Sequence, residues 1–122
     1  MIAYTTLGTN DFPRATAFYD KLLGALGAKR VMEMDRLILW GNAPDAPMVS
    51  VCKPFDGNAA TAGNGTMVAL AAPNRAEVDR MHTLALELGA KDEGKPGPRG
   101  PFYIGYFRDL DGNKLNVFSA AS

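Results

Sequence analysis

One short stretch occurs twice in this chain, each time at the same point in the pattern of predicted elements. The tetrapeptide Leu-Gly-Ala-Lys stands at 26–29 and again at 88–91, so the two copies lie 62 residues apart. Each copy ends a predicted helix and begins a predicted strand. Because an internal repeat indicates copies of one supersecondary unit, we expect the chain to fold as a duplicated unit.

Two amphipathic helices are predicted from apolar residues at helical spacing. The first begins after Asn10 or Asp11, tolerates Pro13 in its first turn and ends at Gly27. The second begins near Asn74 and ends at Gly89. Their apolar faces comprise Ala15, Phe18, Tyr19, Leu22, Leu23 and Leu26 in the first, and Val78, Met81, Ala85 and Leu88 in the second.

The remaining segments are predicted as short strands separated by turn residues. The predicted strands span 2–8, 29–34, 36–41, 48–53, 66–72, 102–108 and 114–118, with a weaker one near 91–93. The run 94–101 is too rich in Gly and Pro for a central strand, so we expect an ordered loop or an edge. The order strand, helix, three strands therefore occurs twice within a single domain of residues 1–122, as module one at about 1–57 and module two at about 63–122.

Composition excludes several classes of protein. With 122 residues the chain is the size of one domain. Its 13 basic and 13 acidic residues give no net charge, which disfavours a nucleic-acid partner. A single cysteine, Cys52, excludes an internal disulfide framework. Since no apolar run approaches membrane-spanning length and no leader pattern is present, we expect a cytoplasmic protein with no membrane partner.

The pattern resembles the vicinal oxygen chelate superfamily, which includes glyoxalase I, bleomycin-resistance proteins and extradiol dioxygenases. The segments 2–11 and 65–72 resemble its first and fifth strands. The turn from Asp109 to Asn113 resembles its Asp-Pro-Asp-Gly-Asn turn, with Leu110 in place of Pro. The resemblance implies an α+β, glyoxalase-like fold of two tandem βαβββ modules, which form a cup-shaped sheet with helices outside. It also implies a homodimer.

The resemblance further implies a divalent metal, held by His and Glu at strand positions that correspond to about Tyr4, Ser50, Met67 and Asn116. These four side chains are weak or unsuitable ligands for such metals. No His or Glu lies within two positions of Tyr4, Met67 or Asn116, and the one histidine, His82, falls in a helix. We therefore expect no metal and no cofactor, and a structural role for His82.

The predicted cup would carry a few polar groups among apolar ones, which is typical of a small-molecule pocket. The same residues would equally suit a filled core. Arg99 and Arg108 are considered as anion ligands, although Arg108 could instead pair with a turn carboxylate. The ligand-binding candidates are Tyr4, Trp40, Ser50, Cys52, Met67, Arg99, Tyr103, Asn116 and Phe118.

Three functions stay open at this point. The first is a metal-free protein that binds a small amphipathic or aromatic molecule. The second is a metal-dependent lyase, isomerase or dioxygenase of the same superfamily, which the ligand positions disfavour. The third is a metal-free enzyme that uses Tyr4 or Cys52, for which no residue spacing gives positive support.

Overall fold

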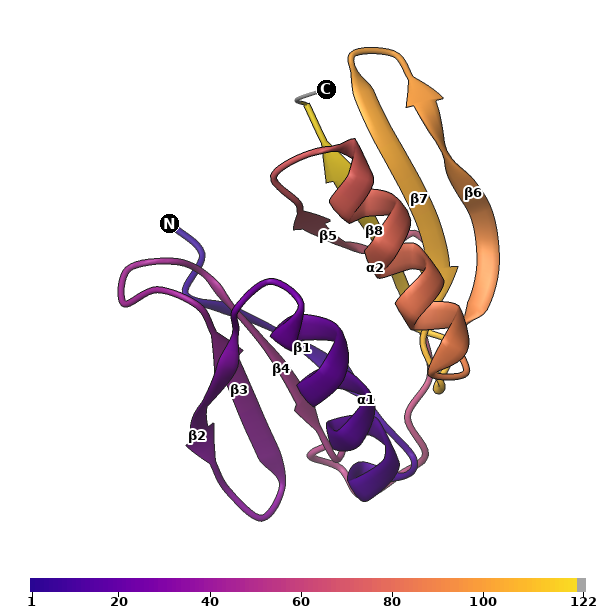
Figure 1. Ribbon diagram of the computed structural model, residues 1–122. Helices are drawn as coiled ribbons and strands as arrows, with labels where there is room; N and C mark the ends of the chain where they lie inside the picture. Colours follow the sequence, from indigo (N-terminus) through magenta and orange to yellow (C-terminus); the bar gives the residue numbers. More distant parts are fainter. Residues whose placement is uncertain (121–122) are drawn as a thin grey trace. The chain divides into compact units, whose positions relative to one another are not determined.

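The protein folds into two compact units, and each has the predicted order strand, helix, three strands (Figure 1). The computed structural model describes residues 1–120. The first unit comprises Met1–Thr61, and the second begins at Ala62. The predicted α+β class with two tandem βαβββ modules is confirmed.

The elements of the first unit are β1 (Tyr4–Gly8), α1 (Phe12–Gly24), β2 (Lys29–Glu33), β3 (Leu37–Gly41) and β4 (Met48–Cys52). Those of the second are β5 (Val68–Ala71), α2 (Arg75–Glu87), β6 (Lys91–Arg99), β7 (Phe102–Arg108) and β8 (Lys114–Ser119). Each unit forms a four-stranded sheet, with the orders β1-β4-β3-β2 and β5-β8-β7-β6. In both sheets the first strand runs parallel to the last, and the other pairs are antiparallel.

Both helices begin at a side chain that caps the first turn. Asp11 accepts a hydrogen bond from the backbone N–H of Arg14 at 3.1 Å, and Asn74 accepts one from Glu77 at 2.9 Å. Such caps satisfy N–H groups that have no partner within the helix. The predicted helix starts therefore agree with the structure.

The repeated tetrapeptide ends both helices in the same way. Its glycine takes a left-handed conformation in each copy, with φ of 76° at Gly27 and 106° at Gly89. The next N–H then returns to a carbonyl of the last helical turn, as in a Schellman motif. These bonds join Ala28 to the Leu23 carbonyl at 3.1 Å and Ala90 to the Ala85 carbonyl at 2.9 Å. The repeated tetrapeptide therefore forms the same helix-to-strand turn in both units.

The Gly/Pro-rich run is an edge strand. β6 continues from Lys91 to Arg99 at the margin of the second sheet, so it is longer than the short strand that the sequence predicts. Its pairing with β7 shifts register between Asp92 and Gly94 and again between Gly94 and Gly97. Proline is tolerated at such an edge because one side of the strand makes no ladder bonds.

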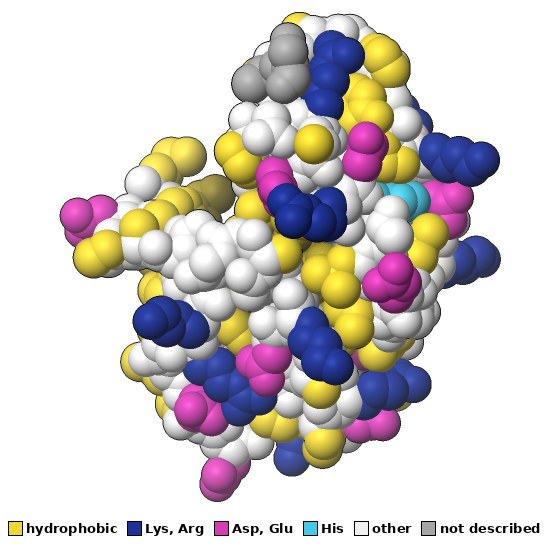
Figure 2. All heavy atoms as spheres, viewed as in Figure 1, with side chains coloured by type: hydrophobic (Ala, Val, Ile, Leu, Met, Phe, Trp, Pro, Cys, Tyr) yellow, Lys and Arg dark blue, Asp and Glu magenta, His cyan; other side chains and the backbone are white. Residues whose placement is uncertain are grey.

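Each core lies between the helix and one face of its own sheet. Large side chains are fully buried there, among them Tyr19, Leu22 and Trp40 in the first unit, and Met81, Phe107 and Leu115 in the second. Across residues 1–120, no helix has the length and apolar character needed to cross a membrane. Basic and acidic side chains are interspersed on the face of the molecule seen in Figure 2.

Candidate functional site

Each sheet has one face under its helix and one face that its own helix leaves free, which we call the helix-free face. Residues directly opposite each other on paired strands point to the same face. On the first sheet, the register places Ser50 opposite Thr6, and Tyr4 opposite Met48. Cys52 follows two residues after Ser50, so Tyr4, Ser50 and Cys52 all lie on the helix-free face.

Ser50 and Cys52 have no sign of nucleophilic activation. The Ser50 side chain is fully buried, and its Oγ donates to the Thr5 carbonyl at 2.9 Å and contacts the Thr6 hydroxyl at 3.1 Å. Burial raises the pKa of the Cys52 thiol, and the Arg36 charge offsets this only in part. Because the thiolate is the reactive form, a raised thiol pKa disfavours catalysis by Cys52.

Trp40 lies on the opposite face of the first sheet, away from the other ligand-binding candidates of this unit, and its role as a ligand contact stays a prediction. Its indole packs 5.9 Å from the Tyr19 ring, and its Nε1 donates to Asp20 of α1 at 2.8 Å. The hydrogen bond from Arg30, opposed by partial burial and helped by Trp40, lowers the pKa of the Asp20 carboxyl. Trp40 is therefore a core residue that fastens β3 to the helix.

Tyr103 also faces a helix, on the side of the second sheet away from Phe118, and its role as a ligand contact stays a prediction. Its hydroxyl donates to Asp79 of α2 at 2.7 Å, and the Arg75 guanidinium lies 5.0 Å from its ring centre. Donation to the Asp79 carboxylate raises the pKa of the Tyr103 hydroxyl. Tyr103 therefore links β7 to α2 on the helix-covered side.

Met67 and Asn116 are brought together on the helix-free side of the second sheet. The Asn116 Nδ2 donates to the Met67 sulfur at 3.6 Å. Asn116 is only 4% exposed, whereas Met67 is 40% exposed. The Asn116 Oδ1 is buried and has no hydrogen-bond partner within the part of the chain that the structure describes.

The side chains at the four expected ligand positions do not fit a divalent metal. Tyr4 offers a phenol and Ser50 a hydroxyl that donates to a backbone carbonyl. Asn116 donates its amide N–H to the Met67 thioether. Such metals need imidazole, thiolate or carboxylate donors. No group of three or more His, Cys, Asp or Glu that could hold a metal ion occurs among residues 1–120.

Phe118 belongs to an aromatic group on the helix-free face of the second sheet. Its ring meets Phe102 edge to face, with centres 5.6 Å apart and planes at 85°. The Tyr106 ring, on the same face, lies 5.1 Å from the Arg99 guanidinium and 5.2 Å from the Lys114 ammonium. The sequence analysis named Phe118 and Arg99 as candidates but did not identify Phe102, Tyr106 or Lys114. Every second residue of a strand lies on the same face, which groups 102, 104 and 106 on one strand and 114, 116 and 118 on the next. This period of two is the sequence signal that would have identified Phe102, Tyr106 and Lys114.

A cavity of about 350 Å³ opens in the second unit, and Lys114 on its wall lies 5.2 Å from the Tyr106 ring centre. Arg108 on its wall donates to Glu93 at 2.8 Å and to the Gly112 carbonyl at 3.1 Å. Arg108 thus pairs with a carboxylate of β6, not with a carboxylate of the turn. The cavity is lined by Gly63, Asn64, Gly65, Thr66, Met67, Arg108 and Lys114.

A second hollow, of about 510 Å³, lies in the first unit and includes none of the predicted ligand-binding residues. It is lined by Gly27, Lys29, Val31, Gly41, Asn42, Ala43, Pro44 and Met48. His82 lines neither cavity. It is buried in α2, with its Nε2 3.1 Å from Asp92 and from the Tyr106 carbonyl, which agrees with a structural role.

Comparison with solved structures identifies the fold in other proteins. A glyoxalase/bleomycin resistance protein from Albidiferax ferrireducens T118 is 32% identical, with 98% of each chain covered and a TM-score of 0.90. Two more distant structures share the fold. A lactoylglutathione lyase from Agrobacterium tumefaciens is 24% identical, with 98% of this chain and 92% of that chain covered and a TM-score of 0.71. A family enzyme from Burkholderia phytofirmans PsJN is 14% identical, with 97% of each chain covered and a TM-score of 0.78.

Comparison of the sequence with families and with individual proteins gives different results. No curated protein sequence matches the chain. The family model described as Glyoxalase/Bleomycin resistance protein/Dioxygenase superfamily matches residues 1–117. Because that match spans nearly the whole sequence and agrees with the duplicated βαβββ fold, the chain belongs to the glyoxalase/bleomycin resistance protein/dioxygenase superfamily.

Proposed function

We propose that this protein binds a small amphipathic or aromatic molecule without the aid of a metal ion, and that the helix-free face of the second sheet carries the ligand. The observation that carries the proposal is the edge-to-face pair of Phe102 and Phe118 beside Tyr106. The candidates Tyr4, Ser50 and Cys52 lie on the helix-free face of the first sheet and stay a separate prediction for that unit by itself.

The aromatic group has the properties that a planar ligand would require. Phe102 is 39% exposed, and Phe118 and Tyr106 are half-buried, so their rings keep surface free for contact. Aromatic pairs gain about 0.5–1.5 kcal/mol beyond the area that they bury. Small-molecule sites typically combine such apolar surface with a few polar groups, and Asn116 and Lys114 lie on this same face.

The metal-free part of the proposal rests on donor chemistry. The residues at the expected ligand positions are a phenol, a hydroxyl, a thioether and an amide, none of which is a strong ligand for Zn²⁺, Ni²⁺ or Fe²⁺. The metal-dependent lyase, isomerase or dioxygenase is therefore the less favoured function. A raised pKa of the Cys52 thiol likewise gives no support to the metal-free enzyme.

A ligand screen with a matched pair of variants tests the proposal. Aromatic and amphipathic compounds should raise the thermal stability of the wild type, since a ligand at 100 times its Kd adds about 2.7 kcal/mol. Phe102→Ala should abolish the shift. Phe55→Ala removes a phenylalanine that is 91% exposed in the first unit, so it should leave the shift unchanged. Equal binding by both variants would place the ligand elsewhere and overturn the site.

Metal analysis tests the other half of the proposal. Purified protein incubated with Ni²⁺, Zn²⁺ or Fe²⁺ and then desalted should retain far less than one ion per chain. Stoichiometric retention, or an activity that a chelator removes, would restore the metal-dependent function.

The proposal also includes a homodimer, as the family resemblance implies, and a cytoplasmic location, with which a chain that has one cysteine and no internal disulfide is compatible. Sedimentation equilibrium should give twice the mass of one chain. A single species of one-chain mass at micromolar concentration would contradict the dimer.

A further inference from the structure

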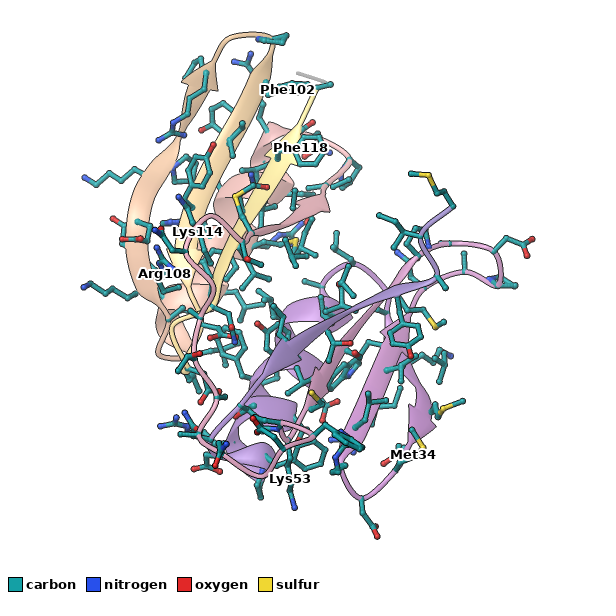
Figure 3. The ribbon with its side chains drawn as sticks, turned by 180° about the vertical axis from the view of Figure 1, so that it is seen from behind. Met34, Lys53, Phe102, Arg108, Lys114 and Phe118 are labelled. Atoms are coloured by element: carbon teal, nitrogen blue, oxygen red, sulfur yellow. The ribbon has the colours of Figure 1, made fainter. Side chains whose placement is uncertain are left out.

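The cavity in the second unit is lined by cations and by no carboxylate. Arg108 and Lys114 contribute from adjacent strands, where the register of β7 and β8 pairs them directly. The turn at 63–66 and the Met67 side chain complete the wall. Figure 3 shows Arg108 and Lys114 near one end of β7 and β8, with Phe102 and Phe118 toward the other end.

Arg108 is held in place and still has donors to spare. Its Nε donates to Glu93 at 2.8 Å, and its Nη1 donates to the Gly112 carbonyl at 3.1 Å. A guanidinium has more N–H groups than these two bonds use. Arg108 is thus a preorganised cation, fixed on one side by β6 and by the turn that follows β7.

Lys114 adds a charge that no carboxylate neutralises by direct contact within residues 1–120. Its ammonium lies 5.2 Å from the Tyr106 ring centre and forms no ion pair there. Donation from Arg108, aided by the charges of Arg108, Lys114 and Lys91, lowers the pKa of the Glu93 carboxyl. Because Arg108 is paired with Glu93, the charge of Lys114 remains as a positive excess on the cavity wall.

We propose that this cavity binds an oxyanion, a carboxylate or a phosphate monoester, that forms the polar end of the ligand. The inference rests on the proposed function and deepens it, because it assigns the ligand an anionic group as well as an aromatic one. Arg offers paired donors that match the oxygens of both groups, and Lys supplies a second point charge.

The spacing along β8 sets the size of such a ligand. Phe118 and Lys114 are four residues apart, which corresponds to about 13 Å along a strand. A ring against Phe118 and an anion near Lys114 therefore require a spacer several bonds long. An ω-phenyloctanoate has about this reach and is a suitable probe.

The experiment compares one scaffold with different head groups. Phenyloctanoate and phenyloctyl phosphate carry the oxyanion, whereas phenyloctanamide carries none. Acetate and inorganic phosphate test the cavity without the aromatic end. Binding is followed through the Met67 methyl signal in protein labelled at the methionine methyl groups, since Met67 lines the cavity. A Met67→Leu variant assigns that signal.

In the wild type, at least one of the two anionic probes should bind about tenfold or more tighter than the amide, in line with the strength of charge-assisted hydrogen bonds. Their relative affinities decide between carboxylate and phosphate. Added salt should weaken this preference. Lys114→Gln should abolish it, whereas Lys91→Gln, which removes an equal charge outside the cavity wall, should preserve it.

Failure of the inference and failure of the proposed function give different results. If the amide binds as tightly as both anionic probes, the anion site is wrong and the aromatic face stands. If acetate or phosphate alone shifts the Met67 signal and the phenyl chain adds no affinity, the anion site stands and the aromatic face is wrong. Absence of any shift would overturn both.

Discussion

Asn116 donates a hydrogen bond to the Met67 sulfur at 3.6 Å while its own carbonyl oxygen is buried without a partner within residues 1–120. The family resemblance implies a carboxylate ligand at the Asn116 position, and here an amide turns toward a thioether. Where the resemblance implies a charged metal ligand, this protein therefore has a neutral amide that is hydrogen-bonded to a neutral thioether within the second sheet. A half-satisfied buried amide costs stability.

Asn116→Leu should stabilise the protein. Replacement of a buried, half-satisfied amide by an apolar side chain of the same branched shape removes the desolvation cost, and we expect the free energy of unfolding to rise by about 1 kcal/mol. Urea denaturation would measure the change. Asn113→Leu is the control with the opposite expected sign, since the Asn113 amide donates to the buried Asp109 carboxylate at 3.0 Å. A loss of stability in Asn116→Leu would show that its carbonyl has a partner in solution.

Asp109→Ala should destabilise the second unit. The Asp109 carboxylate accepts hydrogen bonds from the backbone N–H groups of Asp111 and Asn113, both at 2.9 Å, and from the Asn113 amide. Their loss leaves buried donors unpaired, so we expect a cost of about 3 kcal/mol. The urea midpoint should fall with an unchanged slope. Asp35→Ala, in an exposed turn, should change stability by less than about 0.5 kcal/mol; an equal loss in both variants would contradict the role of Asp109.

The helices, the turn and the duplicated order could be predicted because their signals are local. Asp11, Asn74 and the repeated glycines mark helix ends within a few residues, and Asp109 and Gly112 mark the turn. The fold class follows from the order of these elements.

The faces of Trp40 and Tyr103 could not be predicted in the same way. Residues 37–40 and 102–104 are continuous apolar or aromatic runs, so alternation does not select a face. Each side chain instead has a hydrogen-bond partner on a helix distant in sequence, and this contact shows which face of the sheet it occupies. Asp20 precedes Trp40 by 20 positions, and Asp79 precedes Tyr103 by 24. The cationic cavity was missed for a similar reason, because only the register of β7 and β8 pairs Arg108 with Lys114.

The two repeated glycines should differ in their tolerance of alanine. Both have positive φ, so each replacement should cost about 1 kcal/mol through backbone strain. A Cβ at Gly89 would also lie 3.0 Å from the Leu110 side chain, whereas a Cβ at Gly27 meets nothing within 4 Å. Gly89→Ala should therefore be the more destabilising variant in thermal unfolding. Gly24→Ala, inside α1 with open space at its Cβ, is the control and should be neutral or stabilising. Equal losses at Gly27 and Gly89 would rule out a contribution from Leu110.

Asp20→Asn should make the first unit less stable at neutral pH and should have little effect in acid. The hydrogen bond from Arg30 lowers the pKa of Asp20, with burial opposing it and Trp40 assisting. A carboxyl whose pKa is lower in the folded state adds stability above its unfolded pKa of about 4, and that stability is lost as the pH falls through the folded value. The amide oxygen introduced by this substitution would still accept from Trp40, so the variant isolates the charge.

Melting temperatures of the wild type and Asp20→Asn, measured from neutral pH to about pH 2, would test this dependence. The Asp20 side chain is 40% exposed, so solvent screening limits the expected difference at pH 7 to about 1 kcal/mol or less. The difference should shrink once the pH falls below about 4. In an Arg30→Gln background, where the main cause of the lowered pKa is gone, Asp20→Asn should have a smaller effect at neutral pH. A constant difference across the range would mean that the charge of Asp20 does not contribute to stability.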